Sequence, residues 1–201
     1  MNRLTKSAAG VILAMCAFSF SSCDEDSDVI GLNASTKYGY VKVTIEGEDP
    51  EGEDFEVTKN FKFASSGTPT GSSSVFTYDD DGFYRYFEVD RYITPFDDGD
   101  DSAVNFELQM DGEEEPTLDY GYFNFETAII TEGNKYFSLF ENFNINEEDL
   151  TSYKYSPDTG KLSVKFTKEL SANETNLGQA LTITVDVNVK VFENIGGGID
   201  L

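Results

Sequence analysis

The most regular feature of the chain is an alternation of apolar and polar side chains with a period of two residues. It is longest in LTITVDVNVKV, residues 181–191, where Leu181 and every second residue after it are aliphatic and those between are Thr, Asp, Asn or Lys. Shorter runs with this period lie at residues 41–45, 55–63, 104–110 and 162–166. A period of two places successive side chains on opposite faces, so each run predicts a β-strand with one buried and one solvent-facing side.

Turn signals separate these runs. Asp-Gly pairs stand at 81–82, 98–99 and 111–112, with Glu132-Gly133-Asn134 and Pro157-Asp158-Thr159-Gly160 further along. No segment has a convincing long helical period, and residues 146–152 and 169–180 are expected to form a short turn or a loop. One-sided strands are typical of antiparallel sheets.

The pattern therefore predicts an all-β domain, an antiparallel β-sandwich of roughly eight to ten strands. The alternative is a lipocalin-like closed barrel, because long strands rich in aromatic residues could line a cavity. One strand pairing is expected in detail. A two-residue hairpin turn at Asp81-Gly82 would place Phe76 opposite Phe87 and Tyr78 opposite Arg85.

The first 36 residues lack this alternation. Arg3 and Lys6 precede an apolar run, residues 8–18, that is too short for the roughly 20 residues of a spanning helix. Small residues and one Phe follow, then Cys23 and the acidic run DEDSD. The segment resembles a bacterial lipoprotein signal, and its acidic run resembles the export signal of surface lipoproteins of Bacteroidota.

The resemblance implies cleavage before Cys23 and lipidation of its thiol, which would anchor the chain in the outer membrane at the cell surface. The implied organisation is a signal peptide at 1–22, an acidic tether at 23–36, a single β domain at 37–195 and a tail at 196–201. The alternative is a plain secretory signal or N-terminal anchor in which Cys23 has no role.

Composition excludes several classes of function. The chain has 14 basic and 38 acidic residues, a net charge of −24. Residues 1–22 contain two of the basic residues and no acidic ones, so the remainder has a net charge near −26. Such a charge argues against binding nucleic acid and against lying flat on an anionic bilayer. The absence of His removes serine triads, Cys/His nucleophiles and the usual zinc and haem ligands.

Two acidic segments are candidate calcium sites. In TYDDDGFYRYFE, residues 77–88, Asp79, Asp81 and Glu88 match the calcium-loop pattern, but Thr77 stands where the first carboxylate belongs. Strand-like flanks favour a simple hairpin there. The second segment, FDDGDD, supplies four carboxylates, Asp97, Asp98, Asp100 and Asp101. Its alternative is a solvated acidic loop that discourages edge-to-edge aggregation. No other cofactor is expected.

Aromatic residues give a further candidate site. Tyrosines on a β-sandwich can stack on sugars, and the alternative is that Phe fills the core while Tyr keeps its hydroxyl at the margin. The residues concerned are Tyr84, Tyr86, Phe87, Tyr92, Tyr120, Tyr122, Phe123, Phe125, Tyr136, Phe137 and Phe140. Separately, Ser102 follows Asp101 and precedes Ala103, which resembles the site of protein O-glycosylation in Bacteroidota.

These observations favour a non-enzymatic, lipid-anchored surface lipoprotein with a binding or structural role. Its expected partners are the membrane, reached through the N-terminal lipid, and a glycan or a protein. The alternative is a β module that binds a glycan or small ligand and is stabilised by calcium. A hydrolase that uses two carboxylates is a weaker alternative, since among 38 acids some pair will have a suitable spacing by chance.

Overall fold

The computed structural model describes residues 34–64, 73–79, 83–92, 102–131 and 135–193. Within these ranges the chain forms strands and one turn of 3₁₀ helix, Glu147–Asp149. The strands are β1 (Ala34–Glu48), β2 (Asp54–Ala64), β3 (Ser73–Asp79), β4 (Phe83–Tyr92), β5 (Ala103–Asp111), β6 (Thr117–Ile130), β7 (Tyr136–Asn144), β8 (Leu150–Ser156), β9 (Lys161–Leu170), β10 (Leu181–Lys190) and β11 (Phe192–Glu193).

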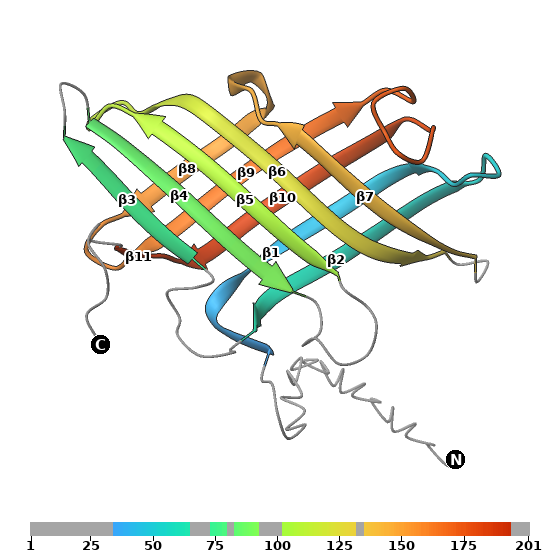
Figure 1. Cartoon of the computed structure of the whole chain (residues 1–201), viewed down its shortest axis with the longest axis horizontal. Helices are drawn as coiled ribbons and strands as arrows, with labels where there is room; N and C mark the ends of the chain where they lie inside the picture. Colours follow the sequence, from blue (N-terminus) through green and yellow to red (C-terminus); the bar gives the residue numbers. More distant parts are fainter. Residues whose placement is uncertain (1–33, 65–72, 80–82, 93–101, 132–134, 194–201) are drawn as a thin grey trace, which may run out of the picture.

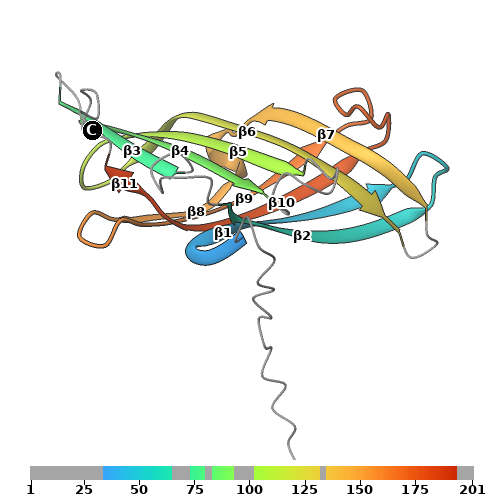
Figure 2. The same cartoon turned by 60° about the horizontal axis from the view of Figure 1, so that its bottom comes forward.

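The strands form two layers whose directions cross (Figures 1 and 2). The first layer has the order β3-β4-β5-β6-β7, and the second has the order β2-β1-β10-β9-β8. Neighbours within each layer are antiparallel. The layers are joined where β2 meets β4 at the pair Lys62–Tyr92, and where the short β11 runs parallel to β3. The all-β, sandwich-like prediction is confirmed.

The alternative of a lipocalin-like barrel is wrong, because the sheet does not close. In the described part of the chain β7 and β8 are the two ends of the strand order, and no pairing joins them. Aromatic side chains also fill the space between the layers. Phe106 and Phe123 of the first layer lie 6.1 and 5.4 Å from Phe166 of the second, between ring centroids. Burial of each such ring contributes about 1.5–3 kcal/mol, which a hollow barrel would forgo.

The alternation seen in the sequence becomes the inner and outer faces of the strands. On β10 the five aliphatic residues are at most 2% exposed, and the residues between them face outward. Antiparallel register extends this pattern across the layer, since Val43 lies opposite Val185, and Val185 lies opposite Phe166. All five alternating runs of the sequence lie in strands of the structure, apart from Val191, which follows the end of β10. Hydrophobic burial therefore fixes the register, because a slip of one residue would expose every buried side chain.

The β3–β4 hairpin forms as expected, but its register differs by one residue. Asp79 pairs with Phe83, so three residues connect the strands where a two-residue turn was predicted. Consequently Phe76 lies opposite Tyr86, and Tyr78 lies opposite Tyr84. Loop length sets hairpin register, and this single extra residue changes every cross-strand partner.

The first described strand begins at Ala34, three residues before the expected start of the domain, so the end of the expected tether belongs to β1. Cys23 and the expected signal peptide and tail lie outside the described residues. Within the described ranges no helix has the length and apolar character needed to cross a membrane.

Candidate functional site

The outer face of the first layer carries an ordered set of aromatic and hydrogen-bonding side chains. They alternate with the buried residues of β4, β5, β6 and β7, so the pattern that builds the core also places them outside. Strand register aligns them in three rows, which we call the tyrosine–amide face: Tyr86, Gln109 and Tyr120; Glu88, Glu107, Tyr122 and Asn144; Asp90, Asn105, Asn124 and Asn142.

Hydrogen bonds hold the polar side chains of this face in position. The hydroxyl of Tyr86 donates to the carboxylate of Glu107. Asn105 Nδ2 donates to Asp90 Oδ1 at 3.0 Å. In the neighbouring part of β6, Asp119 Oδ2 accepts from Gln109 Nε2 at 2.8 Å. Side chains already held by their neighbours lose less conformational entropy when a ligand binds.

The electrostatics of the face disfavour further negative charge. Partial burial raises the pKa of the Glu88 carboxyl, and repulsion from Asp90 and Glu107 raises it further. Burial also raises the pKa of Asp90, although the hydrogen bond from Asn105 opposes this. The pKa of the Tyr120 hydroxyl is raised by burial and by the nearby charge of Glu107. Burial is the largest cause of each shift, and repulsion by neighbouring carboxylates adds to it, so the face is better suited to neutral or cationic groups than to anions.

The two arginines of the first layer's described strands both point inward, and the charge of Arg91 offsets this surplus of carboxylates only in part, by lowering the pKa of Asp90. Arg91 is fully buried, and its guanidinium donates to the backbone oxygens of Asp90 and Tyr38 at 2.7 and 2.9 Å. Burial lowers the pKa of Arg91 to about 10. Arg85 lies 5.2 Å from the ring centroid of Tyr155, which belongs to the opposite layer. The tyrosine–amide face therefore presents acceptors, amides and aromatic rings, and its rows contain no basic residue.

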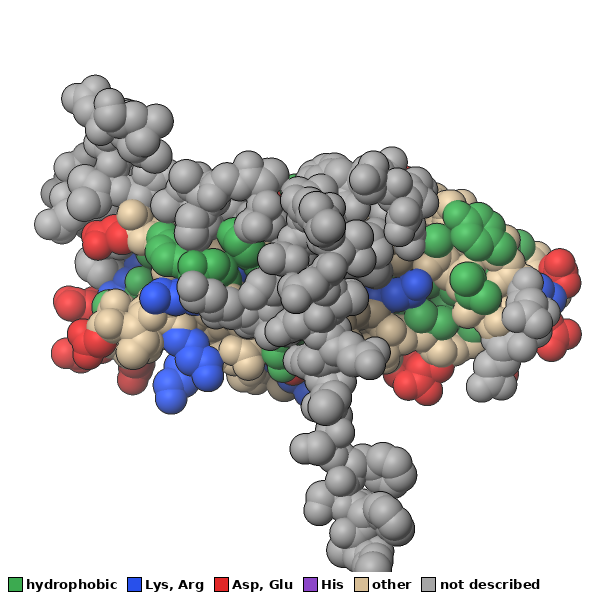
Figure 3. Space-filling model, turned by 90° about the horizontal axis from the view of Figure 1, so that it is seen from below, with side chains coloured by type: hydrophobic (Ala, Val, Ile, Leu, Met, Phe, Trp, Pro, Cys, Tyr) green, Lys and Arg blue, Asp and Glu red, His purple; other side chains and the backbone are tan. Residues whose placement is uncertain are grey.

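The structure separates the predicted aromatic candidates by role. Phe87, Phe123 and Phe125 are fully buried, and Phe137 packs edge-on against Phe55 at 5.5 Å between ring centroids. Three tyrosines, 86, 120 and 122, lie on the tyrosine–amide face, where Tyr120 is 41% exposed. Beyond the rows, the exposed side chains Ile130, Tyr136 and Phe140 end the same outer face near the β6–β7 turn. Figure 3 shows hydrophobic side chains at this end, on the right.

The predicted calcium ligands are not brought together in the described residues. Glu88 lies on the tyrosine–amide face. The backbone of Asp79 ends β3, but its side chain lies outside the described part, as do Asp81, Asp97, Asp98, Asp100 and Asp101. In the described ranges no group of three or more acidic side chains is placed to hold a metal ion.

Ser102, the candidate for glycosylation, is buried. Its side chain is 2% exposed, and its hydroxyl donates to Thr127 Oγ1 at 3.1 Å. A glycosyltransferase needs an exposed hydroxyl, so this position argues against modification of Ser102 in the folded protein.

A pocket of about 430 Å³ opens at the other end of the sandwich, beside the β8–β9 turn. Its lining includes Arg85, Tyr155, Lys190 and Phe192, from four strands. Both cations already contact aromatic rings: Arg85 lies over Tyr155, and Lys190 Nζ lies 5.4 Å from the ring centroid of Phe192. Nothing in the local sequence signals this pocket, because its residues meet only in the folded chain.

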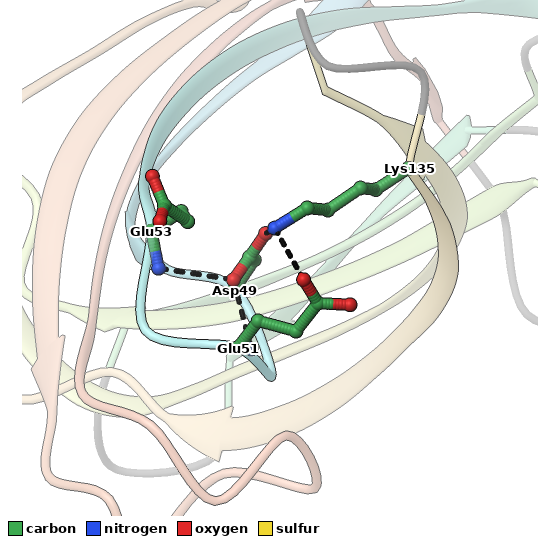
Figure 4. Close-up of polar contacts among 4 residues, drawn as sticks. All are labelled: Asp49, Glu51, Glu53 and Lys135. Carbon is green, nitrogen blue, oxygen red and sulfur yellow. Dashed lines mark hydrogen bonds and ion pairs between the residues drawn. The ribbon is translucent and has the colours of Figure 1, made fainter.

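A cluster of charged residues connects the β1–β2 turn to Lys135, the residue before β7 (Figure 4). Asp49 is 1% exposed, and its Oδ1 accepts from the backbone N–H groups of Glu51 and Glu53 at 2.8 and 3.0 Å. Lys135 Nζ donates to Asp49 Oδ2 at 2.9 Å and pairs with Glu51 at 2.7 Å. These contacts satisfy Asp49 and tie the β1–β2 turn to β7, so the cluster has a structural role.

No protein-family model matches this chain, and no curated protein and no solved structure is detectably similar to it.

Proposed function

We propose that this protein is a non-enzymatic, lipid-anchored envelope protein that binds a neutral glycan through its tyrosine–amide face. The observation that carries the proposal is the three rows, in which tyrosines, amides and carboxylates alternate on an open sheet without a basic residue. Glycans combine weakly apolar ring faces with many hydroxyl groups. They are therefore complemented by aromatic rings and by side chains that both donate and accept hydrogen bonds.

The spacing of the strands suits an extended ligand. Tyr86 and Tyr120 are two strands apart and flank Gln109, which places their backbones about 10 Å from each other. A chain lying across the strands along this row would meet a ring, an amide and a second ring in succession, and the next rows offer carboxylates and then amides beside it. The carboxylates of the face disfavour anionic glycans. Repulsion between the two sets of negative charges would add to the cost of removing water from them.

Binding is favoured over hydrolysis by the shape of the face. Glu88 of β4 is paired with Glu107 of the neighbouring strand β5, so the two residues lie side by side on one open face of the sheet. Glycosidases place a glycosidic bond between two carboxyl groups across a cleft, and this face offers no opposing wall. The same carboxylates can accept hydrogen bonds from sugar hydroxyls without reacting.

The lipid anchor is proposed from the resemblance of residues 1–28 to a lipoprotein signal. Cys23 precedes the first strand residue, Ala34, by 11 positions, so a tether could extend at most about 36–40 Å. A domain held at this distance can reach polymers at the cell surface.

The test uses native affinity electrophoresis of the full chain in gels containing a β-glucan, an α-mannan or an arabinoxylan, with polygalacturonate as the anionic polymer. We expect retardation by at least one neutral polysaccharide and none by polygalacturonate. Tyr120→Ala should weaken that retardation about ten-fold, since loss of one stacked ring costs on the order of 1.4 kcal/mol.

Tyr136→Ala is the matched control, because Tyr136 is a more exposed tyrosine on the same sheet but lies outside the rows. It should bind as the unaltered chain does. Lack of retardation by every neutral polysaccharide, or equal losses in the two variants, would contradict the proposed glycan site.

A further inference from the structure

The outer face of the second layer gathers its lysines in one half. Register across β2, β1, β10, β9 and β8 places six of them in three adjoining rows that contain a single acidic residue, Asp186. We call this half the lysine region. Its rows are Lys62, Tyr40, Asn188, Ser163 and Lys154; Asn60, Lys42, Asp186, Lys165 and Ser152; Lys190, Lys161 and Ser156.

A row of threonines separates the lysine region from an acidic half. Thr44 and Thr58 hydroxyls lie 3.0 Å apart, and those of Thr167 and Thr184 lie 3.2 Å apart. The rows beyond carry five carboxylates and no lysine: Glu56, Glu46, Thr182 and Glu169; Asp54 and Glu48. The face is therefore divided by charge, although neither half is evident from the net charge of −24.

The lysines of this region are not neutralised by the described residues. The ion pairs found there involve only Lys135 and Lys168, which lie outside the rows. Lys154, Lys161, Lys165 and Lys190 are exposed. Figure 3 shows basic side chains in the left half of the view, with acidic side chains at both ends of the molecule. Six like charges kept together in so acidic a chain repel one another, and an anionic partner would remove that repulsion.

The chain enters the fold at the same half. β1 begins at Ala34 and passes Tyr40 and Lys42 before it reaches Glu46 and Glu48. A membrane anchor at Cys23 would therefore be joined to the molecule on the lysine side, within a tether length of at most about 40 Å.

We propose that the lysine region docks on the phosphate-bearing headgroups of the membrane that holds the anchor, and so turns the tyrosine–amide face away from the membrane. The two faces lie on opposite sides of the sandwich (Figure 2), so docking of one exposes the other. The orientation rests on the proposed lipid anchor. The docking itself needs only the lysines and can be tested without the anchor or a glycan.

The net charge argues against lying flat on an anionic bilayer, but it does not oppose a short-range contact made by the lysine region alone. Electrostatic effects through water fall off over a Debye length of about 8 Å at physiological ionic strength. The two sheets of a sandwich are about 10 Å apart, so the carboxylates of the tyrosine–amide face lie beyond that distance from docked headgroups. Each lysine close to an anionic lipid surface strengthens binding about five-fold. A tether would add to this by keeping the region near the membrane.

The test compares binding of the full chain carrying Cys23→Ser, which cannot be lipidated, to vesicles of phosphatidylcholine with and without phosphatidylglycerol. Residues 1–22, with Arg3, Lys6 and the apolar run, are the same in every variant, so the difference between variants reports the lysines of the region. We expect preferential binding to the vesicles with phosphatidylglycerol, lost as salt is raised. Combined Lys42→Gln, Lys154→Gln and Lys165→Gln changes should weaken it about 100-fold.

The matched control replaces the same three lysines by arginine, which keeps the charges, and it should retain the preference. Equal losses in both variants, or no loss in the glutamine variant, would overturn the proposal. The proposal would also be overturned if polygalacturonate, added at the same total negative charge as the vesicles, competed with them for the lysines. The region would then recognise anionic glycans. Retardation by neutral polysaccharides should be unchanged in the glutamine variant, so failure of either proposal can be told from failure of the other.

Discussion

At the scale of single residues, the fold depends on a few buried polar groups that form hydrogen bonds between strands. Arg91 links β4 to the backbone of Tyr38 in β1, and its Nη2 lies 3.3 Å from Ser73 Oγ in β3. Ser73 Oγ in turn donates to the backbone oxygen of Lys190 at 2.8 Å. A buried charge is tolerated only where hydrogen bonds replace its water, and here they hold strands of both layers together.

Asp49 gives a prediction for pH dependence. The hydrogen bond from Lys135 is the main cause that lowers the pKa of its carboxyl below 3.8, and backbone donors add to it. Below pH 3.8 the unfolded state therefore binds more protons at this site than the folded state. The contribution of Asp49 to stability is present above that pH and is lost as pH falls through the folded-state pKa.

Asp49→Asn should destabilise the protein at neutral pH and make its unfolding midpoint less sensitive to acid below pH 3.8. Urea unfolding followed by circular dichroism at several pH values measures both effects. Asp54→Asn, at an exposed position, serves as the control. Parallel acid profiles for Asp49→Asn and the unaltered chain would show that Asp49 carries no such linkage.

At the scale of elements, close approach between strands decides where glycine is required. Gly39 lies in β1 with φ +87°, between the pairs where the β1–β2 register shifts. A Cβ placed there would stand 2.0 Å from the backbone oxygen of Asn188 and 2.6 Å from Val189 Cα. Neither backbone atom can move aside without breaking the β1–β10 ladder, so both the conformation and the contact demand glycine.

Gly39→Ala should therefore cost more than about 2 kcal/mol in the free energy of unfolding. Gly178→Ala separates the two causes, because Gly178 has φ +72° but no atom within 4 Å of the added Cβ. This second variant should lose only about 1 kcal/mol, from backbone strain alone. Midpoints of urea unfolding give both values. Equal midpoints for the two variants would mean that the crowding at Asn188 has no energetic effect.

At the scale of the whole molecule, the distribution of charge matters more than its sum. Carboxylates crowd the tyrosine–amide face and one half of the opposite face, while lysines occupy the other half. Self-repulsion among the carboxylates opposes the compact state and is weakened by salt.

Raising sodium chloride from about 0.01 to about 0.15 M shortens the Debye length from about 30 to about 8 Å. The melting temperature should then rise by about 2–4 °C, if screening recovers about 1 kcal/mol of stability in a domain of this size. A fall in melting temperature would indicate that attractive pairs such as Lys135–Asp49 outweigh the repulsion. Differential scanning calorimetry makes the comparison.

The same calorimetry addresses calcium. Calcium at about 100 times the dissociation constant of a site should add about 2.7 kcal/mol. A greater stabilisation by calcium than by magnesium at equal ionic strength would place a site among the acidic segments that include Asp81 and Asp97. Equal stabilisation by both ions would mean that screening of the carboxylates alone causes the effect.

The alternating pattern predicted β1, β2, β5, β9 and β10 but not their partners. Residues 181–191 predict a strand with one dry face, and the structure confirms it in β10. The β3–β4 register was predicted one residue out, because a three-residue connection cannot be told from a two-residue turn by the Asp81-Gly82 signal. The tyrosines were identified as candidates, but their alignment with Gln109 and Asn105 depends on pairings that span the sheet.

The sequence by itself determined the all-β class and the one-sided strands, since a period of two assigns each side chain to a face. It also determined that His-dependent chemistry is excluded. Only the tertiary structure decided that the sheet stays open, that Asp49 meets Lys135, and that lysines and carboxylates separate across a row of threonines. These features join residues far apart in the chain. Their neighbours are set by strand order and register, which local patterns do not specify.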